Sequence, residues 1–414
     1  YIDGNTIEAD KTGLGINWGA PNPEGMQPHF FIEDTTITGG SSSNSIGLYM
    51  NNVNDSYLQN LDISNFDKGA YLENSTVHEY LNGTISGTTI YSFNLTEDSD
   101  VYTINTTFDD TQVIFMDYES LLEVAWYMHV SVETTIGYPV KNADLVVSDT
   151  YGTEVYNGTS GTDGMVKDII CMDYVENRTG ILENYNDYTA WADKLGQTND
   201  MTVTMDSTKW VTIVLVDIEK PTITDETSGA PETDANFTFD ASVSDNWEVA
   251  EVHLYYYFEV LGGTTTAQNI TMDDLGGGSY SSSVGVASDR VDLIYYISAM
   301  DTSGNWKSTS ENTLSVTDTI QPTAVAGDNQ TVNLGTEVTF NGSASSDNIG
   351  IEDYSWRFTY DGDSILLNGS APTFIFNKVG VFEVELTITD GDGNQDTDNM
   401  TVTVLDDISP IADA

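Results

Sequence analysis

One pattern recurs four times in the first third of the chain: Asp34-Thr-Thr-Ile37, Asn60-Leu-Asp-Ile63, Asn82-Gly-Thr-Ile85 and Asn105-Thr-Thr-Phe108. The apolar residues that end these segments follow one another at intervals of 26, 22 and 23 residues, and an Asp or Asn stands three positions before each. Such a period is typical of a solenoid, in which one coil buries its apolar face only by stacking on its neighbours. Asn or Asp in register along the stack can form side-chain ladders.

A second apolar series accompanies the first and consists of Leu48, Tyr71, Phe93 and Ile114. With both series, residues 1–117 resemble a right-handed parallel β-helix of the pectate-lyase-like type, with about five coils. Proteins of that shape include polysaccharide lyases and hydrolases, so the resemblance also raises an enzymatic alternative.

Composition bounds the function. The 414 residues contain 66 Asp and Glu against 12 Lys and Arg, a formal charge of −54, and the excess is spread along the whole chain. This charge excludes a nucleic-acid binder and disfavours anionic lipid surfaces.

A content of 39% hydrophobic residues indicates a folded protein, and the single Cys171 excludes an internal disulfide framework. A salty or calcium-containing exterior fits this charge, because ions screen the self-repulsion. No signal peptide is recognisable at Tyr1.

Residues 118–217 change to alternating β-patterns, with Gly137-Tyr-Pro-Val140 followed by Ala143, Leu145 and Val147, and a turn at Thr162-Asp-Gly164. This segment resembles the carboxypeptidase regulatory-like, transthyretin-like sandwich, which implies a rigid spacer without chemistry of its own. Residues 118–129 fit a first strand better than a helix. Residues 218–317 resemble an immunoglobulin-like or fibronectin-type sandwich, with strands around Asn236–Asp240, Val252–Tyr257 and Leu293–Ser298.

Residues 318–406 carry the sharpest resemblance. Trp356-Arg-Phe358, Phe374-Ile-Phe376 and Gly380 through Asp390 follow one another as in a PKD domain, an immunoglobulin-like sandwich of extracellular proteins and archaeal surface layers. Trp356 is expected to pack in the core. Residues 407–414 are expected to begin a further module. The expected fold class is therefore all-β: a parallel β-helix followed by three β-sandwiches.

The joints between the sandwiches also repeat. Asp217, Asp318 and Asp406 each stand four residues before a proline, at Pro221, Pro322 and Pro410. Proline fixes its own φ and keeps the preceding residue extended, so these joints are expected to be short and semi-rigid.

Calcium is the cofactor expected, because it prefers carboxylate and amide oxygens. In immunoglobulin-like sandwiches the loop after the second strand and the last hairpin loop lie at the same end. The predicted ligands come from these two loops in both sandwiches: Asp245, Asp301, Asn305, Asp347, Asp390 and Asp392. Ordinary turn chemistry is the alternative, since turns use the same residue types.

Glycosylation is the second expectation. Asn-x-Ser/Thr motifs are spread through every module, although the motif is short and arises by chance. The predicted sites are Asn54, Asn74, Asn94, Asn157, Asn177, Asn236, Asn269, Asn329, Asn341, Asn368 and Asn399. The motifs at Asn82 and Asn105 are set aside because these residues belong to the predicted ladder.

No catalytic residue is predicted. Residues 1–117 contain no Arg and only Lys11 and Lys68, and His29 and His78 lack ligand-like spacing. Cys171 is expected in the core. No nearby Lys or Arg argues for a lowered pKa of its thiol, which a reactive cysteine would need. Half of the aromatic run Tyr255-Tyr-Tyr-Phe258 and Tyr295-Tyr296 should face the core, and the other half is a candidate surface for sugars or partners.

The expected function is structural: a glycosylated, cation-stabilised, archaeal-type component of a cell envelope, surface layer, sheath or filament, outside the cell. Self-assembly into a homo-oligomer, lattice or filament is the expected partnership, with glycans as further partners and no membrane span in this segment. The alternatives are an adhesin or carbohydrate-binding surface protein and, after it, a polysaccharide-degrading enzyme.

Overall fold

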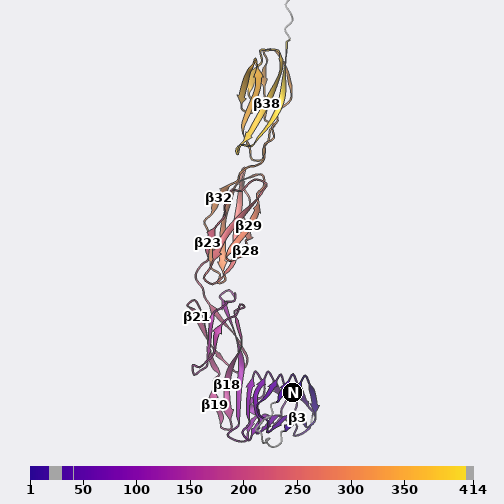
Figure 1. Cartoon of the computed structure of the whole chain (residues 1–414), viewed down its shortest axis with the longest axis vertical. Coiled ribbons are helices and arrows are strands. Elements are labelled where there is room, and N and C mark those ends of the chain that lie inside the picture. Colours follow the sequence, from indigo (N-terminus) through magenta and orange to yellow (C-terminus); the bar gives the residue numbers. More distant parts are fainter. Residues whose placement is uncertain (18–29, 41, 407–414) are drawn as a thin grey trace, which may run out of the picture. The chain divides into compact units, whose positions relative to one another are not determined.

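The computed structural model describes residues 1–17, 30–40 and 42–406, which form two compact units, Tyr1–Ile218 and Glu219–Ala414 (Figure 1). His29 and the further module expected at residues 407–414 lie outside the described residues. The described chain consists of strands and one short 3-10 helix, η1 (Asp110–Gln112), which confirms the all-β class.

The repeat region of unit 1 forms three parallel sheets. The first sheet contains β1 (Ile2–Asp3), β4 (Phe31–Glu33), β7 (Ser56–Gln59), β10 (Thr76–Leu81), β13 (Asp100–Ile104) and β15 (Leu121–Thr134). The second contains β2 (Thr6–Ala9), β5 (Thr36–Gly39), β8 (Asp62–Ser64) and β11 (Thr84–Ser86). The third contains β3 (Thr12–Asn17), β6 (Ile46–Asn51), β9 (Lys68–Glu73), β12 (Tyr91–Thr96) and β14 (Val113–Phe115). In these sheets the strands up to β13 pair with the strand three before them, while β14 pairs with β12 and β15 with β13.

The first apolar series stacks as predicted. Ile37 pairs with Ile63, and Ile63 with Ile85, and all three are buried. The residues three positions earlier form the predicted ladder: Asn60 Nδ2 donates to Asp34 Oδ1, and Asn105 Nδ2 to Asn82 Oδ1, each over 2.7 Å. These four residues have φ between 48° and 52°, a left-handed conformation that Asn and Asp adopt more readily than other non-glycine residues.

The second apolar series is corrected by one residue at two positions. Leu48 pairs with Ala70 rather than Tyr71, and Phe93 pairs with Val113 rather than Ile114. Tyr71 instead lies beside Tyr49, outside the core. Successive residues of a strand face opposite sides, so a shift of one residue exchanges the buried and the exposed face.

The repeat region continues into the first sandwich through the shared strand β15, which confirms a strand over this segment. The first part of β15 pairs in parallel with β13, while most of its length pairs antiparallel with β18 (Met165–Asn177), and its end pairs in parallel with β22 (Lys209–Leu215). β19 (Gly180–Asn184) extends this sheet beyond β18. The opposite sheet contains β17 (Glu154–Thr159), β16 (Asp144–Ser148), β20 (Asp187–Lys194) and β21 (Gln197–Thr204).

Unit 2 contains two further sandwiches with separate hydrophobic cores. In the first, one sheet contains β23 (Thr222–Asp225), β24 (Asn236–Ser244), β29 (Ser279–Gly285) and β28 (Asp273–Gly276). The other contains β26 (Gly263–Thr264), β25 (Val249–Val260), β30 (Arg290–Asp301) and β31 (Trp306–Ser308), with β27 (Gln268–Thr271) on β25 and β32 (Asn312–Ser315) on β30.

The last sandwich has a five-stranded sheet with β33 (Gln330–Asn333), β39 (Gln395–Leu405), β38 (Gly380–Asp390), β35 (Ile351–Tyr360) and β36 (Asp363–Asn368). β34 (Glu337–Thr339) and β37 (Thr373–Ile375) form the facing pair. Trp356 is fully buried, packs 5.3 Å from the ring of Phe340 and donates its Nε1–H to the carbonyl oxygen of Gly369. The core role predicted for Trp356 is confirmed.

Candidate cation site at the joint of unit 2

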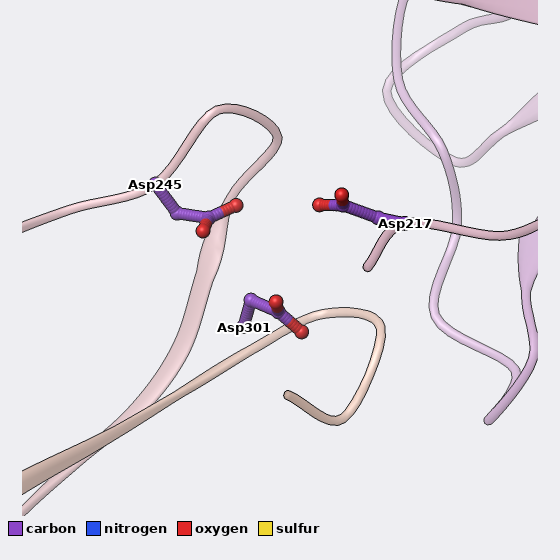
Figure 2. A group of neighbouring side chains, drawn as sticks. All are labelled: Asp217, Asp245 and Asp301. Atoms are coloured by element: carbon purple, nitrogen blue, oxygen red, sulfur yellow. The ribbon is translucent and has the colours of Figure 1, made fainter. Parts of the chain in front are cut away.

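Two loops of the first sandwich of unit 2 present the acidic residues predicted as ligands (Figure 2). Asp301 ends β30 and is fully buried, and its Oδ1 accepts hydrogen bonds from the backbone N–H groups of Ser303 and Asn305 at 2.7 and 2.9 Å. Asp245 follows β24, and its Oδ1 accepts from the N–H of Trp247. Each carboxylate therefore also closes the turn in which it lies.

The last sandwich repeats this arrangement. Asp390 ends β38 and is 2% exposed, and its Oδ1 accepts from the N–H groups of Asp392 and Asn394. Asn394 Nδ2 donates to Asp390 Oδ2 as Asn305 Nδ2 does to Asp301 Oδ2, each over 2.8 Å. The two hairpin loops thus share one hydrogen-bond pattern, five residues long.

Three carboxylates converge at the joint between these two sandwiches. One oxygen atom each of Asp318, Asp347 and Asp390 lies within 4.8 Å of the other two. Asp318 is 4% exposed, Asp390 is 2% exposed, and Asp347 is half-buried. Three formal negative charges in so small and dry a space repel one another unless a cation compensates them.

The joint residue Asp318 contacts both sandwiches. Its Oδ1 accepts from Thr233 Oγ1 at 3.0 Å in the first sandwich, and both of its carboxylate oxygens accept from Asn348 Nδ2 at 3.0 Å in the second. Asn348 Nδ2 also donates to the carbonyl oxygen of Ser288, and Asn394 Nδ2 to that of Asp318. The carboxylate cluster therefore lies where the two sandwiches and their joint meet.

Two oxygens at this cluster are buried and have no hydrogen-bond partner among the described residues, Asp347 Oδ1 and Asn348 Oδ1. A buried acceptor without a partner destabilises the fold, and buried polar groups in folded proteins are usually satisfied. Carboxylate and amide oxygens are also the ligands that Ca²⁺ uses, six to eight at a time. The donor set at Asp318, Asp347, Asn348 and Asp390 therefore fits a calcium ion.

The structure separates the predicted ligands into two groups. Asp347 and Asp390 belong to the cluster at the joint, whereas Asp392 lies beside it and accepts from the N–H of Asp318 over 2.9 Å. Asn305 binds its own loop through Asp301. Sequence reasoning missed Asp318 as a member of the carboxylate cluster, although its Asp-x-x-x-Pro spacing repeats at the joints. Asp217 occupies the same place before Pro221 and is drawn in Figure 2.

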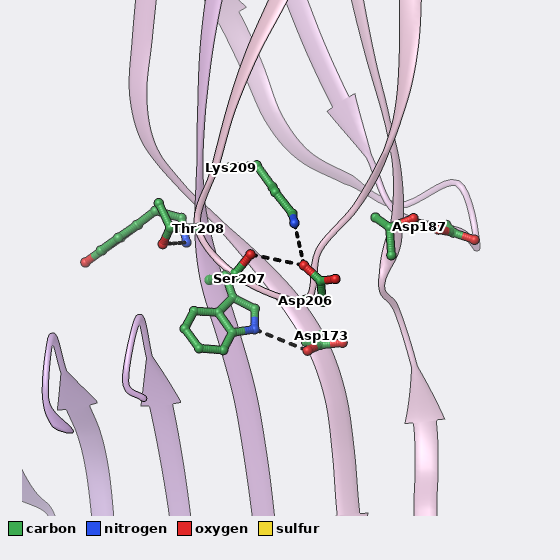
Figure 3. Close-up of polar contacts among 9 residues, drawn as sticks. Asp173, Asp187, Asp206, Ser207, Thr208 and Lys209 are labelled. Atoms are coloured by element: carbon green, nitrogen blue, oxygen red, sulfur yellow. Dashed lines mark hydrogen bonds and ion pairs between the residues drawn. The ribbon is translucent and has the colours of Figure 1, made fainter. Parts of the chain in front are cut away.

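A second polar cluster, in unit 1, has a structural role (Figure 3). Trp126 Nε1 donates to Asp173 Oδ2 at 3.2 Å, and burial raises the pKa of the Asp173 carboxyl. Lys209 pairs with Asp206, and the bond from Lys209 lowers the pKa of that carboxyl. Thr208 Oγ1 donates to Asn105 Oδ1 at 2.6 Å. These contacts fasten the segment before β22 to the ladder of the last coils.

Cys171 and His78 lie in separate places and have separate surroundings. Cys171 is fully buried on β18, and burial raises the pKa of its thiol to about 12, so the core role expected for it is confirmed. His78 is exposed on the outer face of β10 at an irregularity in the strand pairing. Its ring lies 5.2 Å from that of Tyr57, which stacks on Phe31 at 5.0 Å.

The side-chain nitrogens of the predicted glycosylation sites differ in their contacts. In the repeat region Asn74 Nδ2 donates to Asn52 Oδ1. Asn157 Nδ2 donates to Glu154, and Asn177 Nδ2 to the carbonyl oxygen of Tyr118. A sugar on any of these nitrogens competes with a hydrogen bond of the fold.

Comparison with known proteins confirms the resemblance of the last sandwich. Residues 319–404 match the family model of the PKD domain. Collagenase ColA of Clostridium perfringens (strain 13 / Type A) is 35% identical over 88 residues, which are 21% of this chain and 8% of the collagenase. The chain thus spans a small part of that relative's length.

Solved structures of tandem β-domains are similar at low identity. A tetra-tandem repeat in the extending region of a large adhesion protein is 17% identical, over 67% of this chain and 74% of that one, with a TM-score of 0.30. A bacterial ice-binding adhesin of 1.5 MDa is 13% identical, over 69% of this chain and 98% of that one, with a TM-score of 0.22. Within the described residues, no helix has the length and apolar character needed to cross a membrane.

Proposed function

We propose that this chain is a structural component of an extracellular surface assembly: a cell envelope, surface layer, sheath or filament in which β-modules follow one another and calcium stiffens their joint. We include in this proposal that residues 1–117 form a right-handed parallel β-helix, that the chain is a glycoprotein, and that its setting is archaeal-type. The role is non-enzymatic. The PKD domain supports an extracellular setting at the level of its family, and the charge of −54 supports a cation-rich one.

The observation that carries the proposal is the position of Asp318. Asp318 belongs to neither hydrophobic core of unit 2. It is nevertheless buried between the two sandwiches and faces two further carboxylates. A cation there binds the folded joint and not the unfolded chain, so the stability that it adds rises with the logarithm of its free concentration once that exceeds the dissociation constant. A joint held in this way suits a protein that bridges distance.

The test is calorimetric titration of the chain with Ca²⁺, followed by negative-stain microscopy with and without the ion. We expect saturable binding that Asp318→Asn and Asp347→Asn each weaken about 10-fold or more, because each removes a charged ligand. Asp353→Asn is the matched control, since Asp353 is exposed on β35 of the same sandwich. Equal binding by all four proteins contradicts the cation site, and a chain that stays monomeric with saturating calcium contradicts the assembly.

An adhesin is the second candidate, favoured by the aromatic rings on the outer face of the repeat region. Phe31, Tyr57 and His78 lie in a row across β4, β7 and β10, and the Phe31 and Tyr57 rings are 5° from parallel. Flat aromatic faces of this kind suit saccharides. Saturable binding on a glycan array that Tyr57→Ser abolishes, by a chain that does not self-assemble, favours this candidate over the first.

A further inference from the structure

The outer face of the β25–β30 sheet in the first sandwich of unit 2 carries aromatic side chains that its core does not use. Val252, Leu254 and Phe258 of β25 point inward, together with Leu293, Tyr295 and Ile297 of β30. The alternate positions His253, Tyr255 and Tyr296 are half-buried and face outward. The sequence prediction that the aromatic residues divide between the two faces is thus confirmed.

These outward side chains form a continuous aromatic surface, which we call the aromatic platform: His253, Tyr255, Tyr296 and Trp306. The rings of Tyr255 and Tyr296 stack at 4.7 Å and lie 5° from parallel. His253 lies 6.3 Å from Tyr255 and 5.9 Å from Trp306, which is 41% exposed.

Small residues let Trp306 reach across its neighbour strand. Ser298 of β30 pairs with both His253 and Ser308, and Ser308 Oγ donates to Ser298 Oγ at 3.0 Å. No bulky side chain therefore stands between His253 and the edge strand β31 along this row. The platform extends over three strands as a result.

Asn269 lies at the edge of the platform and starts a glycosylation motif, Asn269-Ile-Thr271. In the strand pairing it is opposite Tyr255, which is opposite Tyr296, so the three side chains form one row across β27, β25 and β30. Directly opposed residues on one face of a sheet have Cβ atoms roughly 5 Å apart. A sugar attached to Asn269 therefore begins beside the first ring of the stack.

The side-chain oxygen of Asn269 contacts His253, whereas its side-chain nitrogen is left available for an attached sugar. Asn269 Oδ1 lies 2.9 Å from His253 Nδ1, and His253 Nε2 lies 3.0 Å from Glu251 Oε2. Nδ2, the atom to which an N-linked sugar is joined, has no partner among the described residues, in contrast to Asn74, Asn157 and Asn177.

We propose that Asn269 carries an N-linked glycan whose first sugars pack on the aromatic platform. A pyranose ring presents C–H groups on its face and hydroxyl groups at its rim, and the faces of aromatic rings are weakly negative and attract such C–H groups. Glu251, which contacts His253 of the platform, offers acceptors to the hydroxyl groups. The glycan covers rings that are otherwise open to solvent. This inference rests on the glycoprotein part of the proposed function.

The test combines glycopeptide mass spectrometry with thermal unfolding of the full chain, secreted from an N-glycosylating host. Tyr255→Ser is measured in the intact chain and in Thr271→Ala, which destroys the motif but keeps Asn269. We expect an occupied Asn269 and a melting temperature of this sandwich that Tyr255→Ser lowers by about 3 °C more with the glycan than without it. Tyr257→Ser is the control on the same strand and should show equal losses in both backgrounds.

Four outcomes overturn the inference. If Asn269 carries no sugar while other motifs are occupied, this inference is contradicted but the proposal that the chain is a glycoprotein is kept. If no motif carries sugar, both proposals are contradicted. Equal effects of Tyr255→Ser in the two backgrounds show that the glycan does not pack on the platform. A free oligosaccharide that binds the Thr271→Ala chain and loses its affinity with Tyr255→Ser assigns the platform to an external saccharide instead.

Discussion

Polar side chains stabilise the stacked coils of unit 1 and the joint of unit 2 in different ways. In the coils a row of neutral serine side chains satisfies buried backbone N–H groups: Ser75 N–H donates to Ser99 Oγ, and Ser99 N–H to Ser120 Oγ, at 3.0 and 2.9 Å. At the joint the buried groups are charged and alike: Asp318, Asp347 and Asp390. A neutral ladder is complete within the chain, whereas a carboxylate cluster needs a cation from outside. The two regions should therefore respond differently to the same perturbation.

Removal of calcium should separate the regions most strongly. With free calcium about 100-fold above its dissociation constant, the ion stabilises the folded state by about 3 kcal/mol. Excess chelator should therefore lower the melting temperature of the sandwiches of unit 2 by about 10 °C and leave that of the coils unchanged. Scanning calorimetry combined with hydrogen exchange assigns each transition, and equal shifts in both units would contradict the contrast.

The serine ladder should be sensitive to a change that leaves the joint unaffected. Ser99→Ala removes the oxygen that accepts from the buried N–H of Ser75, and an unsatisfied buried donor destabilises by about 1–3 kcal/mol. The free energy of unfolding of unit 1, measured by hydrogen exchange in β12 and β13, should fall by this amount. Ser86→Ala on the exposed face of β11 is the control and should change it by less than about 0.5 kcal/mol.

The amide ladder should show a smaller effect that depends on backbone conformation. Asn82 has φ of 52° and accepts from Asn105 Nδ2. Asn82→Ala should destabilise unit 1 by about 1–2 kcal/mol, because alanine is strained in this conformation. Asn82→Gly loses the same hydrogen bond but no strain, so it should destabilise less, as measured by urea unfolding of unglycosylated protein. Equal losses in the two variants would show that the hydrogen bond, not the φ value, selects asparagine.

A change of pH should have the smallest effect on the stability of unit 1. Lower pH should stabilise this unit, whereas in ordinary acid denaturation lower pH destabilises the folded state. Burial raises the pKa of Asp100, Glu123 and Asp173 in unit 1, so the folded state binds more protons than the unfolded state in the window between the two pKa values. This contribution to stability is present at low pH and is lost as the pH rises through the folded values. Hydrogen exchange in β13 and β15, corrected for its intrinsic pH dependence, should be slower at pH 5 than at pH 7, and the opposite order would contradict the role of burial.

The sequence predicts those features that repeat at a fixed spacing and misses those that depend on register. Ile37, Ile63 and Ile85 and the ladder before them are apparent from their period, because each position serves the same purpose in every coil. The second apolar series is wrong by one residue at Tyr71 and Ile114, since the repeats differ in length by a residue or two. The ladder of Ser75, Ser99 and Ser120 is not apparent from the sequence, because serine also occurs throughout the loops.

The candidate site is predictable in its loops but not in its centre. Asp347 and Asp390 follow from the topology of a sandwich, which places two particular loops at one end. Asp318 belongs to no loop of either sandwich, and only the three-dimensional joint brings it within 4.8 Å of the other two. Its spacing before Pro322 was visible in the sequence, but a repeated spacing at a joint indicates backbone geometry as readily as it indicates a ligand.

The shared strand β15 also decides how the parallel stack can change in length. Over Leu122–Ala125 it has β13 on one side and antiparallel β18 on the other, so the sheet edge on which another coil would be added is already occupied. An open edge of a parallel stack is a template for runaway polymerisation with further chains. Because β18 runs antiparallel along β15, the first sheet cannot take up a further parallel strand at this edge, whereas the second and third sheets end at β11 and β14.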